Sequence, residues 1–200
     1  MSFHLGLDLG QAFDYTAIAI IEKIPPSGGD GKARAEDLFL LRYLDRLNLG
    51  TPYPEVVRRV KGLLQTPPVA GDVYCVVDAT GGGIPVVDMF REAKVFPLVA
   101  ITITGGHTVS QDGRNYTVPK RDLVSLLQVH LQNDRLRIAE GLPLAKILVR
   151  EMQNFRMKIN IATGHDSYEA WREGDHDDLV LAVALALWYA VELRPVWHLL

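Results

Sequence analysis

The stretch FHLGLDLG at residues 3–10 is a short, mostly apolar run that ends in Asp8-Leu9-Gly10. Strand interiors are depleted in aspartate, so an acidic residue at the end of such a run points to a function. Apolar and β-branched residues at 16–24 and 38–44 predict two further strands, and Pro25-Pro26 begins a Gly-rich turn between them. Three strands joined by short connections predict an antiparallel meander.

After residue 54 the pattern changes to alternating helices and strands. Continuous apolar runs predict buried strands at 73–78 and 97–103, and 136–138 is a short extended piece. Helical spacing predicts helices at 54–65, 85–93, 119–132, 143–154 and 176–193. Residues 155–172 are expected to form a β-hairpin that projects from the rest. The order predicts one α/β domain over residues 1–200: a mixed five-stranded sheet, its first three strands antiparallel, with helices on both faces.

The composition excludes several classes of protein. Of the 200 residues 48% are hydrophobic and 22% charged, values that exclude a disordered or collagen-like chain. A single cysteine, Cys75, excludes a disulfide framework and a Cys-rich zinc site. The N-terminus does not resemble a signal peptide, and the longest apolar run, 179–191, is too short to span a bilayer. We therefore expect a cytoplasmic protein with no membrane partner.

Acidic residues occupy three places that this fold would bring together. Asp8 ends the first strand, Asp78 ends the fourth, and Asp177 and Asp178 open the last helix. If the first and fourth strands are parallel neighbours, their aspartates enter one crevice at the carboxyl ends of the sheet. Converging carboxylates repel one another unless a cation neutralises them, and oxygen ligands suit Mg²⁺ or Mn²⁺. Two such ions would support phosphodiester hydrolysis.

Each acidic position also has a purely structural explanation. Asp78 precedes a Gly-rich turn and could be an ordinary turn residue. Asp177 and Asp178 could simply favour the positive end of the helix dipole. The joint pattern is more specific than any single member.

Four motifs occur in a fixed order. They are Gly6-Leu7-Asp8-Leu9-Gly10-Gln11 followed by Asp14-Tyr15-Thr16, then Val77-Asp78-Ala79-Thr80-Gly81-Gly82-Gly83, Val118-Pro119-Lys120-Arg121-Asp122-Leu123, and His176-Asp177-Asp178-Leu179-Val180. Together they resemble the C-terminal nuclease domain of the large terminase subunit of tailed bacteriophages, over about residues 4–192. The resemblance implies an RNase H-like, RuvC-like fold and an endonuclease that cuts DNA during packaging.

The resemblance also implies roles for individual residues. A catalytic, metal-binding triad carries over to Asp8, Asp78 and the pair Asp177 and Asp178, of which Asp178 is the preferred catalytic residue. Two Mg²⁺ or Mn²⁺ ions would bind there. The accessory positions are Asp14, Lys120 and His176.

Terminase large subunits also carry an ATPase domain with a GxxxxGK[ST] loop, and this sequence contains no such loop. We therefore expect a nuclease domain alone, with an ATPase domain or other packaging proteins as partners. If the chain is encoded by a phage or prophage, it would act in the host cytoplasm.

Double-stranded DNA needs a local basic surface, because the whole chain has a net charge of −3. Residues 120–158 supply one, with eight basic and four acidic residues. The expected DNA contacts are Lys120, Arg121, Arg156 and Lys158.

Two other functions remain open from the sequence. One is a non-catalytic DNA-binding or packaging-motor module that retains the fold. The other is an ASKHA-type nucleotide-binding domain, which also begins with an Asp-x-Gly strand, although such families use two lobes and need a longer chain.

Overall fold

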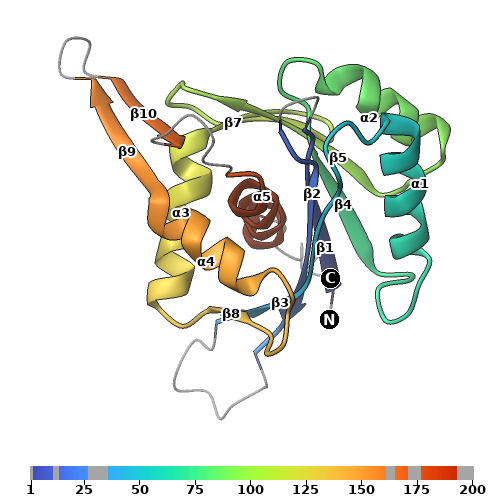
Figure 1. The fold of residues 1–200 in the computed structure, drawn as a ribbon, viewed down its shortest axis with the longest axis horizontal. Helices are drawn as coiled ribbons and strands as arrows, with labels where there is room; N and C mark the ends of the chain where they lie inside the picture. Colours follow the sequence, from blue (N-terminus) through green and yellow to red (C-terminus); the bar gives the residue numbers. More distant parts are fainter. Residues whose placement is uncertain (1, 11–13, 27–35, 161–164, 171–176, 193–200) are drawn as a thin grey trace, which may run out of the picture.

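The computed structural model describes residues 2–10, 14–26, 36–160, 165–170 and 177–192, and for 155–160 and 165–170 it describes the backbone alone. The first three strands, β1 (Ser2–Asp8), β2 (Ala17–Ile24) and β3 (Leu38–Arg46), form the predicted antiparallel meander. Next to β1 on its other side lies β4 (Val73–Asp78), and β5 (Leu98–Thr104) follows; both are parallel to β1. This central part of the sheet agrees with the sequence analysis (Figure 1).

The sheet has eight strands, so the predicted count of five is wrong. The order is β6-β7-β5-β4-β1-β2-β3-β8. The additional strands are short: β6 (Ser110–Asp112), β7 (Asn115–Pro119) and β8 (Leu136–Ile138). The sequences of β6 and β7 carry no strand signal, because β6 is fully exposed and β7 is buried only at its end; β8 coincides with the extended piece expected at 136–138.

Helices cover both faces of the sheet, as predicted. The helices α1 (Tyr53–Leu64) and α2 (Gly83–Glu92) pack on one face. The other face carries α3 (Lys120–Gln132), α4 (Ala145–Asn154) and α5 (Asp178–Glu192) (Figure 1). Each face has its own hydrophobic core, and β1 contributes to the one beneath α1 and α2 through Leu5 and Leu7. The strands β9 (Phe155–Asn160) and β10 (His165–Ala170) form a separate antiparallel pair.

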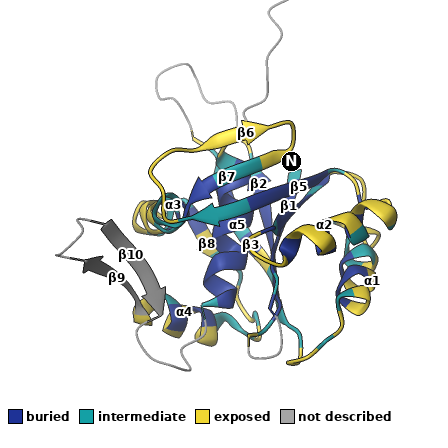
Figure 2. Ribbon diagram, turned by 90° about the horizontal axis from the view of Figure 1, so that it is seen from above, coloured by how far each residue is buried: buried dark blue, intermediate teal, exposed yellow. Residues whose placement is uncertain are grey.

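Helix α5 is buried almost throughout, which explains why its sequence is apolar on every side (Figure 2). It packs unusually close to β1 at Gly6. A Cβ atom at Gly6 would lie 2.0 Å from the backbone oxygen of Ala182 and 2.8 Å from the backbone nitrogen of Ala186. Only glycine fits there, and the close packing fixes the acidic start of α5 relative to the end of β1. Within the described ranges, no helix is both long and apolar enough to cross a bilayer.

Candidate metal centre

The register of β1 and β4 places Asp8 and Asp78 side by side. The last paired residues of these parallel strands are Leu7 and Val77, and the aspartates follow them directly. Parallel strands end at the same edge of the sheet, so both carboxyl groups emerge at one place. The expected parallel pairing of the first and fourth strands is therefore present.

Three other carboxylates act electrostatically on Asp8. Burial raises the pKa of Asp8 well above its usual range, and the carboxylates of Asp78, Asp177 and Asp178 raise it further, while Lys120 lowers it. The pKa of Asp78 is raised by burial, against hydrogen bonds from Thr80 and Asp8 that lower it. We call Asp8, Asp78, Asp177 and Asp178 the acidic cluster. Its central member, Asp8, is only 9% exposed.

Thr80 fixes the carboxylate of Asp78. The backbone N–H of Thr80 donates to Oδ1 of Asp78 at 2.8 Å, and the Thr80 hydroxyl donates to the same oxygen. The hydroxyl oxygen in turn accepts the backbone N–H of Ile103, on β5, at 2.8 Å. A Cβ at Gly83 would lie 2.6 Å from the backbone oxygen of Asp78, so glycine is required where α2 begins. The Gly-rich turn after Asp78 therefore both orients the Asp78 carboxylate and allows α2 to begin close to β4.

Two cations hold the acidic pair at the start of α5. Nζ of Lys120, the first residue of α3, lies 3.0 Å from Oδ2 of Asp177, and both side chains are partly exposed. Asp178 is 3% exposed, and Nε of Arg46, at the end of β3, lies 2.7 Å from its Oδ2. Arg46 also pairs with Glu151 of α4.

The donor set fits a hard divalent cation. All four groups of the acidic cluster offer carboxylate oxygens, with no thiol or imidazole among them, and Mg²⁺ and Mn²⁺ prefer such ligands. Ionised Asp8 is costly in its buried surroundings, and a nearby cation would offset that cost. As the described side chains stand, no three His, Cys, Asp or Glu groups converge closely enough to hold a metal ion. Lys120 and Arg46 contact two members of the cluster, Asp177 and Asp178 respectively.

The remaining predicted site residues are not all brought to the cluster. Asp14 is exposed in the connection after β1, and no described ion pair joins it to the acidic cluster. Arg121 pairs with the adjacent Asp122 at 3.3 Å and donates to the backbone oxygen of His107. His176 and the side chains of Arg156 and Lys158 lie outside the described residues.

Three residues of this site were missed by the sequence analysis. Thr80 carried a signal, since Asp-x-Thr before glycines suits a side-chain turn in which Asp78 accepts from the backbone two residues on. Arg46 and Glu151 carried none, because 105 residues separate them.

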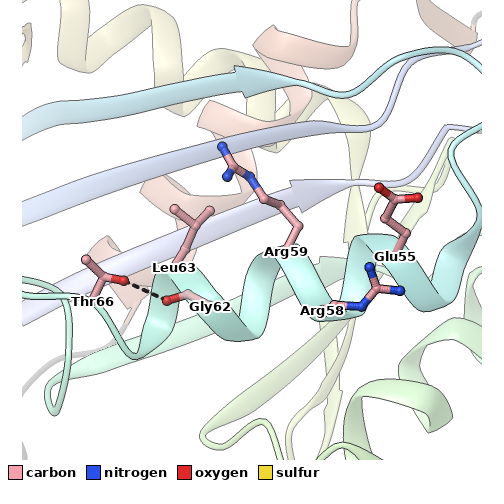
Figure 3. A pocket seen from close by; sticks show the side chains of 6 residues that line it. All are labelled: Glu55, Arg58, Arg59, Gly62, Leu63 and Thr66. Carbon is pink, nitrogen blue, oxygen red and sulfur yellow. Dashed lines mark hydrogen bonds between the residues drawn. The ribbon is translucent and has the colours of Figure 1, made fainter.

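A separate hollow of about 440 Å³ runs along α1 (Figure 3). No member of the acidic cluster lines it; its walls are Glu55, Arg58, Arg59, Gly62, Leu63 and Thr66. The candidate metal centre is therefore not this hollow.

A mixed sheet with an antiparallel meander, helices on both faces and carboxylates at the ends of its central strands defines the RNase H-like class. Within that class the chain has the fold of terminase nuclease domains, as the resemblance of its motifs implies. The large terminase nuclease of the thermophilic phage G20c superposes with a TM-score of 0.60 and 21% identity, over 92% of this chain and 80% of that one.

Two further structures agree. The Human cytomegalovirus terminase nuclease domain, soaked with Mn and bound to an inhibitor, gives a TM-score of 0.53 at 14% identity, over 94% of this chain and 82% of that one. The nuclease domain of the large terminase of bacteriophage SPP1, with bound Mn, gives 0.53 at 12% identity, over 94% and 86%. No protein-family profile and no curated protein matches the sequence. The likeness is one of fold.

Proposed function

We propose that this chain is a divalent-metal-dependent DNA endonuclease of the terminase type, cutting double-stranded DNA during packaging. The observation that carries the proposal is that the carboxylates of Asp78, Asp177 and Asp178 act electrostatically on buried Asp8, at the carboxyl ends of β1 and β4. Two of the structures that share its fold contain manganese. An ATPase domain or other packaging proteins would be its partners, in the host cytoplasm.

Asp8, Asp78 and Asp178, with Asp177 beside them, would hold two Mg²⁺ or Mn²⁺ ions. When bound, such ions activate water and stabilise the leaving oxygen of a phosphodiester. The protein's own contribution is to hold the ligands still. Thr80 orients one oxygen of Asp78 through two hydrogen bonds. The close packing of α5 on Gly6 fixes the position of Asp177 and Asp178 relative to the end of β1.

Lys120 would contact the scissile phosphate. Its ammonium group already lies at the edge of the acidic cluster, 3.0 Å from Asp177, at the start of α3. A lysine in that position can stabilise negative charge that develops on phosphoryl oxygens. His176 precedes the acidic pair in sequence and is a second accessory candidate, as is Asp14.

The DNA path follows α4 and the strand after it. Several basic residues of 120–158 are already ion-paired, among them Arg135 with Glu36 and Arg137 with Asp134. Lys146 and Arg150 are exposed one helical turn apart on α4, and neither is ion-paired with another described residue. The chain continues directly into β9, which carries Arg156 and Lys158. Lys120 and Arg121 would complete the path near the metal centre.

The test is incubation of the full chain with supercoiled plasmid in Mg²⁺, Mn²⁺ or EDTA, followed by gel analysis. Nicked or linear plasmid is expected with a metal and not with EDTA. Asp8→Asn is the matched control, since it keeps the side-chain shape and removes one ligand charge. No cleavage with either metal, together with retained DNA binding, would favour the non-catalytic DNA-binding module.

A further inference from the structure

Arg46 joins three separate segments beneath the acidic cluster. It is the last residue of β3, and its side chain is 15% exposed. The guanidinium carbon lies 5.0 Å from the centre of the Tyr15 ring, in the connection between β1 and β2. The same group pairs with Glu151 of α4 and with Asp178 of α5. A planar guanidinium can stack on a ring while its N–H donors, held in a fixed fork, address two carboxylates; an ammonium lacks this planar, fixed geometry.

Glu151 anchors this arrangement to the start of α5. Its Oε2 accepts the backbone N–H groups of Leu179 at 3.2 Å and Val180 at 3.3 Å. N–H groups in the first turn of a helix have no partner within the helix, so Glu151 caps α5 from another element. Its other oxygen, Oε1, receives Arg46. Glu151 therefore fixes both the beginning of α5 and the guanidinium next to it.

Arg46, held by Glu151, also contacts Asp178. Nε of Arg46 lies 2.7 Å from Oδ2 of Asp178, an ion pair by distance without the alignment of a hydrogen bond. Asp178 is buried, so it cannot take its orientation from solvent. The guanidinium contacts one of its two carboxylate oxygens, Oδ2.

We propose that Arg46 is a positioning residue that orients the Asp178 carboxylate toward the metal centre, with Glu151 holding Arg46 in place. The inference rests on the proposed function and deepens it. Carboxylates that bind metal ions are themselves held by hydrogen-bonded or charged partners, and loss of such a partner typically weakens metal binding or activity by about 10- to 100-fold. A buried ion pair of this kind is weak evidence for stability.

The first test is the Mn²⁺ affinity of the full chain, measured by isothermal titration calorimetry. Arg46→Gln should bind Mn²⁺ about 10- to 100-fold more weakly than the wild type. Arg46→Lys keeps the charge and loses the planar fork, so its affinity should fall between the two. Arg42→Gln is the matched control: Arg42 is on the same strand, and its Nε lies 2.6 Å from buried Glu22. Its Mn²⁺ affinity should be that of the wild type.

The second test is a double-mutant cycle, which separates positioning from a general structural role. If Arg46 acts through Asp178, Arg46→Gln should change Mn²⁺ affinity by less than about twofold in an Asp178→Asn background. An equal loss in both backgrounds overturns the inference. So does wild-type affinity in a folded Arg46→Gln variant.

Glu151→Gln keeps the inference testable if Arg46→Gln does not fold. The amide oxygen still accepts the N–H groups of Leu179 and Val180, while the charge that holds Arg46 is removed. A weaker Mn²⁺ affinity that disappears with Asp178→Asn supports the inference, and an unchanged affinity contradicts it. If the wild type itself binds no Mn²⁺, the proposed function fails and the inference falls with it. If the wild type binds Mn²⁺ and these variants bind equally well, only the inference fails.

Discussion

Nζ of Lys120 lies 3.0 Å from Oδ2 of Asp177, and this contact joins the first residue of α3 to the residue just before α5. The ammonium group therefore partly neutralises the acidic cluster and would also meet a phosphate that enters it. Removal of the Lys120 charge should therefore affect metal binding and DNA cleavage differently.

Lys120→Gln should lower the plasmid cleavage rate by about 100-fold, the cost of removing one charged donor from a developing oxyanion. It should not weaken Mn²⁺ binding, because Lys120 competes with the ion for the acidic cluster. Cleavage rates at saturating Mn²⁺ and calorimetric titration measure the two effects. Lys61→Gln, on α1 at the opposite face of the sheet, is the control and should change neither. A parallel loss of Mn²⁺ affinity would contradict the assigned role.

Replacing each acidic residue with asparagine should reduce plasmid cleavage by different amounts. Asp8→Asn, Asp78→Asn and Asp178→Asn should each reduce cleavage by at least about 100-fold, since a catalytic metal supplies several kcal/mol of transition-state stabilisation. Asp177→Asn should be milder, because Asp177 lies just before α5, is partly exposed and already pairs with Lys120. Plasmid cleavage at matched protein concentration measures all four. If Asp177→Asn abolishes cleavage and Asp178→Asn does not, Asp177 rather than Asp178 is the metal ligand. If all four variants cut like the wild type, the proposed metal site is wrong.

The metal-free protein should lose stability as the pH rises. Burial raises the pKa of Asp8 above its usual 3.8 in the folded state, so folding favours the protonated acid. Burial likewise raises the pKa of Glu151 from 4.5 to about 7. The stabilisation from each acid is complete below its unfolded pKa and is lost as the pH passes through the folded pKa. For Glu151 that interval runs from about pH 4.5 to about pH 7.

Asp8→Asn removes one of these titrating groups. In EDTA its Tm should exceed that of the wild type by a margin that grows from pH 5 to pH 8, reaching at least about 3 °C. Saturating Mg²⁺ should reverse the order, since only the wild type retains the full set of ligands. Thermal melts at both pH values provide the comparison. A margin that does not change with pH would show that Asp8 is ionised without cost.

Thr80→Val should lower cleavage by about tenfold, in line with the loss of a partner that orients a metal ligand. Valine has a similar shape, but it can neither donate to Asp78 nor accept the N–H of Ile103. Thr80→Ser keeps the hydroxyl and should restore most of the rate. The kcat values of the two variants distinguish the effect of side-chain shape from that of hydrogen bonding. Equal kcat values for both variants would show that the Thr80 hydroxyl has no role in the site.

Arg156→Ala combined with Lys158→Ala should weaken DNA binding and flatten its salt dependence, because fewer counterions are released. The two positions are two residues apart on β9. Fluorescence anisotropy at several salt concentrations gives the slope. Arg137→Ala is the control, since Arg137 already pairs with Asp134. An unchanged slope in the double variant would place β9 outside the interface.

The central sheet and its acidic ends could be predicted because both depend on local patterns. An apolar run that ends in aspartate indicates a strand and its carboxyl end at once, and parallel neighbours share that edge, as Asp8 and Asp78 do. The exposed strands β6 and β7 could not be found by apolar pattern. Their one local signal was the Asp112-Gly113 turn, where Gly113 has a φ of +60°.

The partners of Asp178 could not be predicted from the sequence. Arg46, Glu151 and Asp178 come from a strand and two helices, and they meet only because α4 and α5 pack on one face of the sheet. In the sequence, Glu151 is one of several charged residues on an amphipathic helix. Contacts of this kind depend on the packed fold, so no spacing rule reveals them.

Both outer strands of the eight-stranded sheet are only three residues long: β6 at one edge and β8 at the other. Unpaired N–H and C=O groups along an edge are what another chain would use to extend a sheet, and such short strands offer very few of them. The sheet is therefore a poor template for strand-by-strand aggregation, which favours a domain that stays dispersed at the concentrations that calorimetry requires.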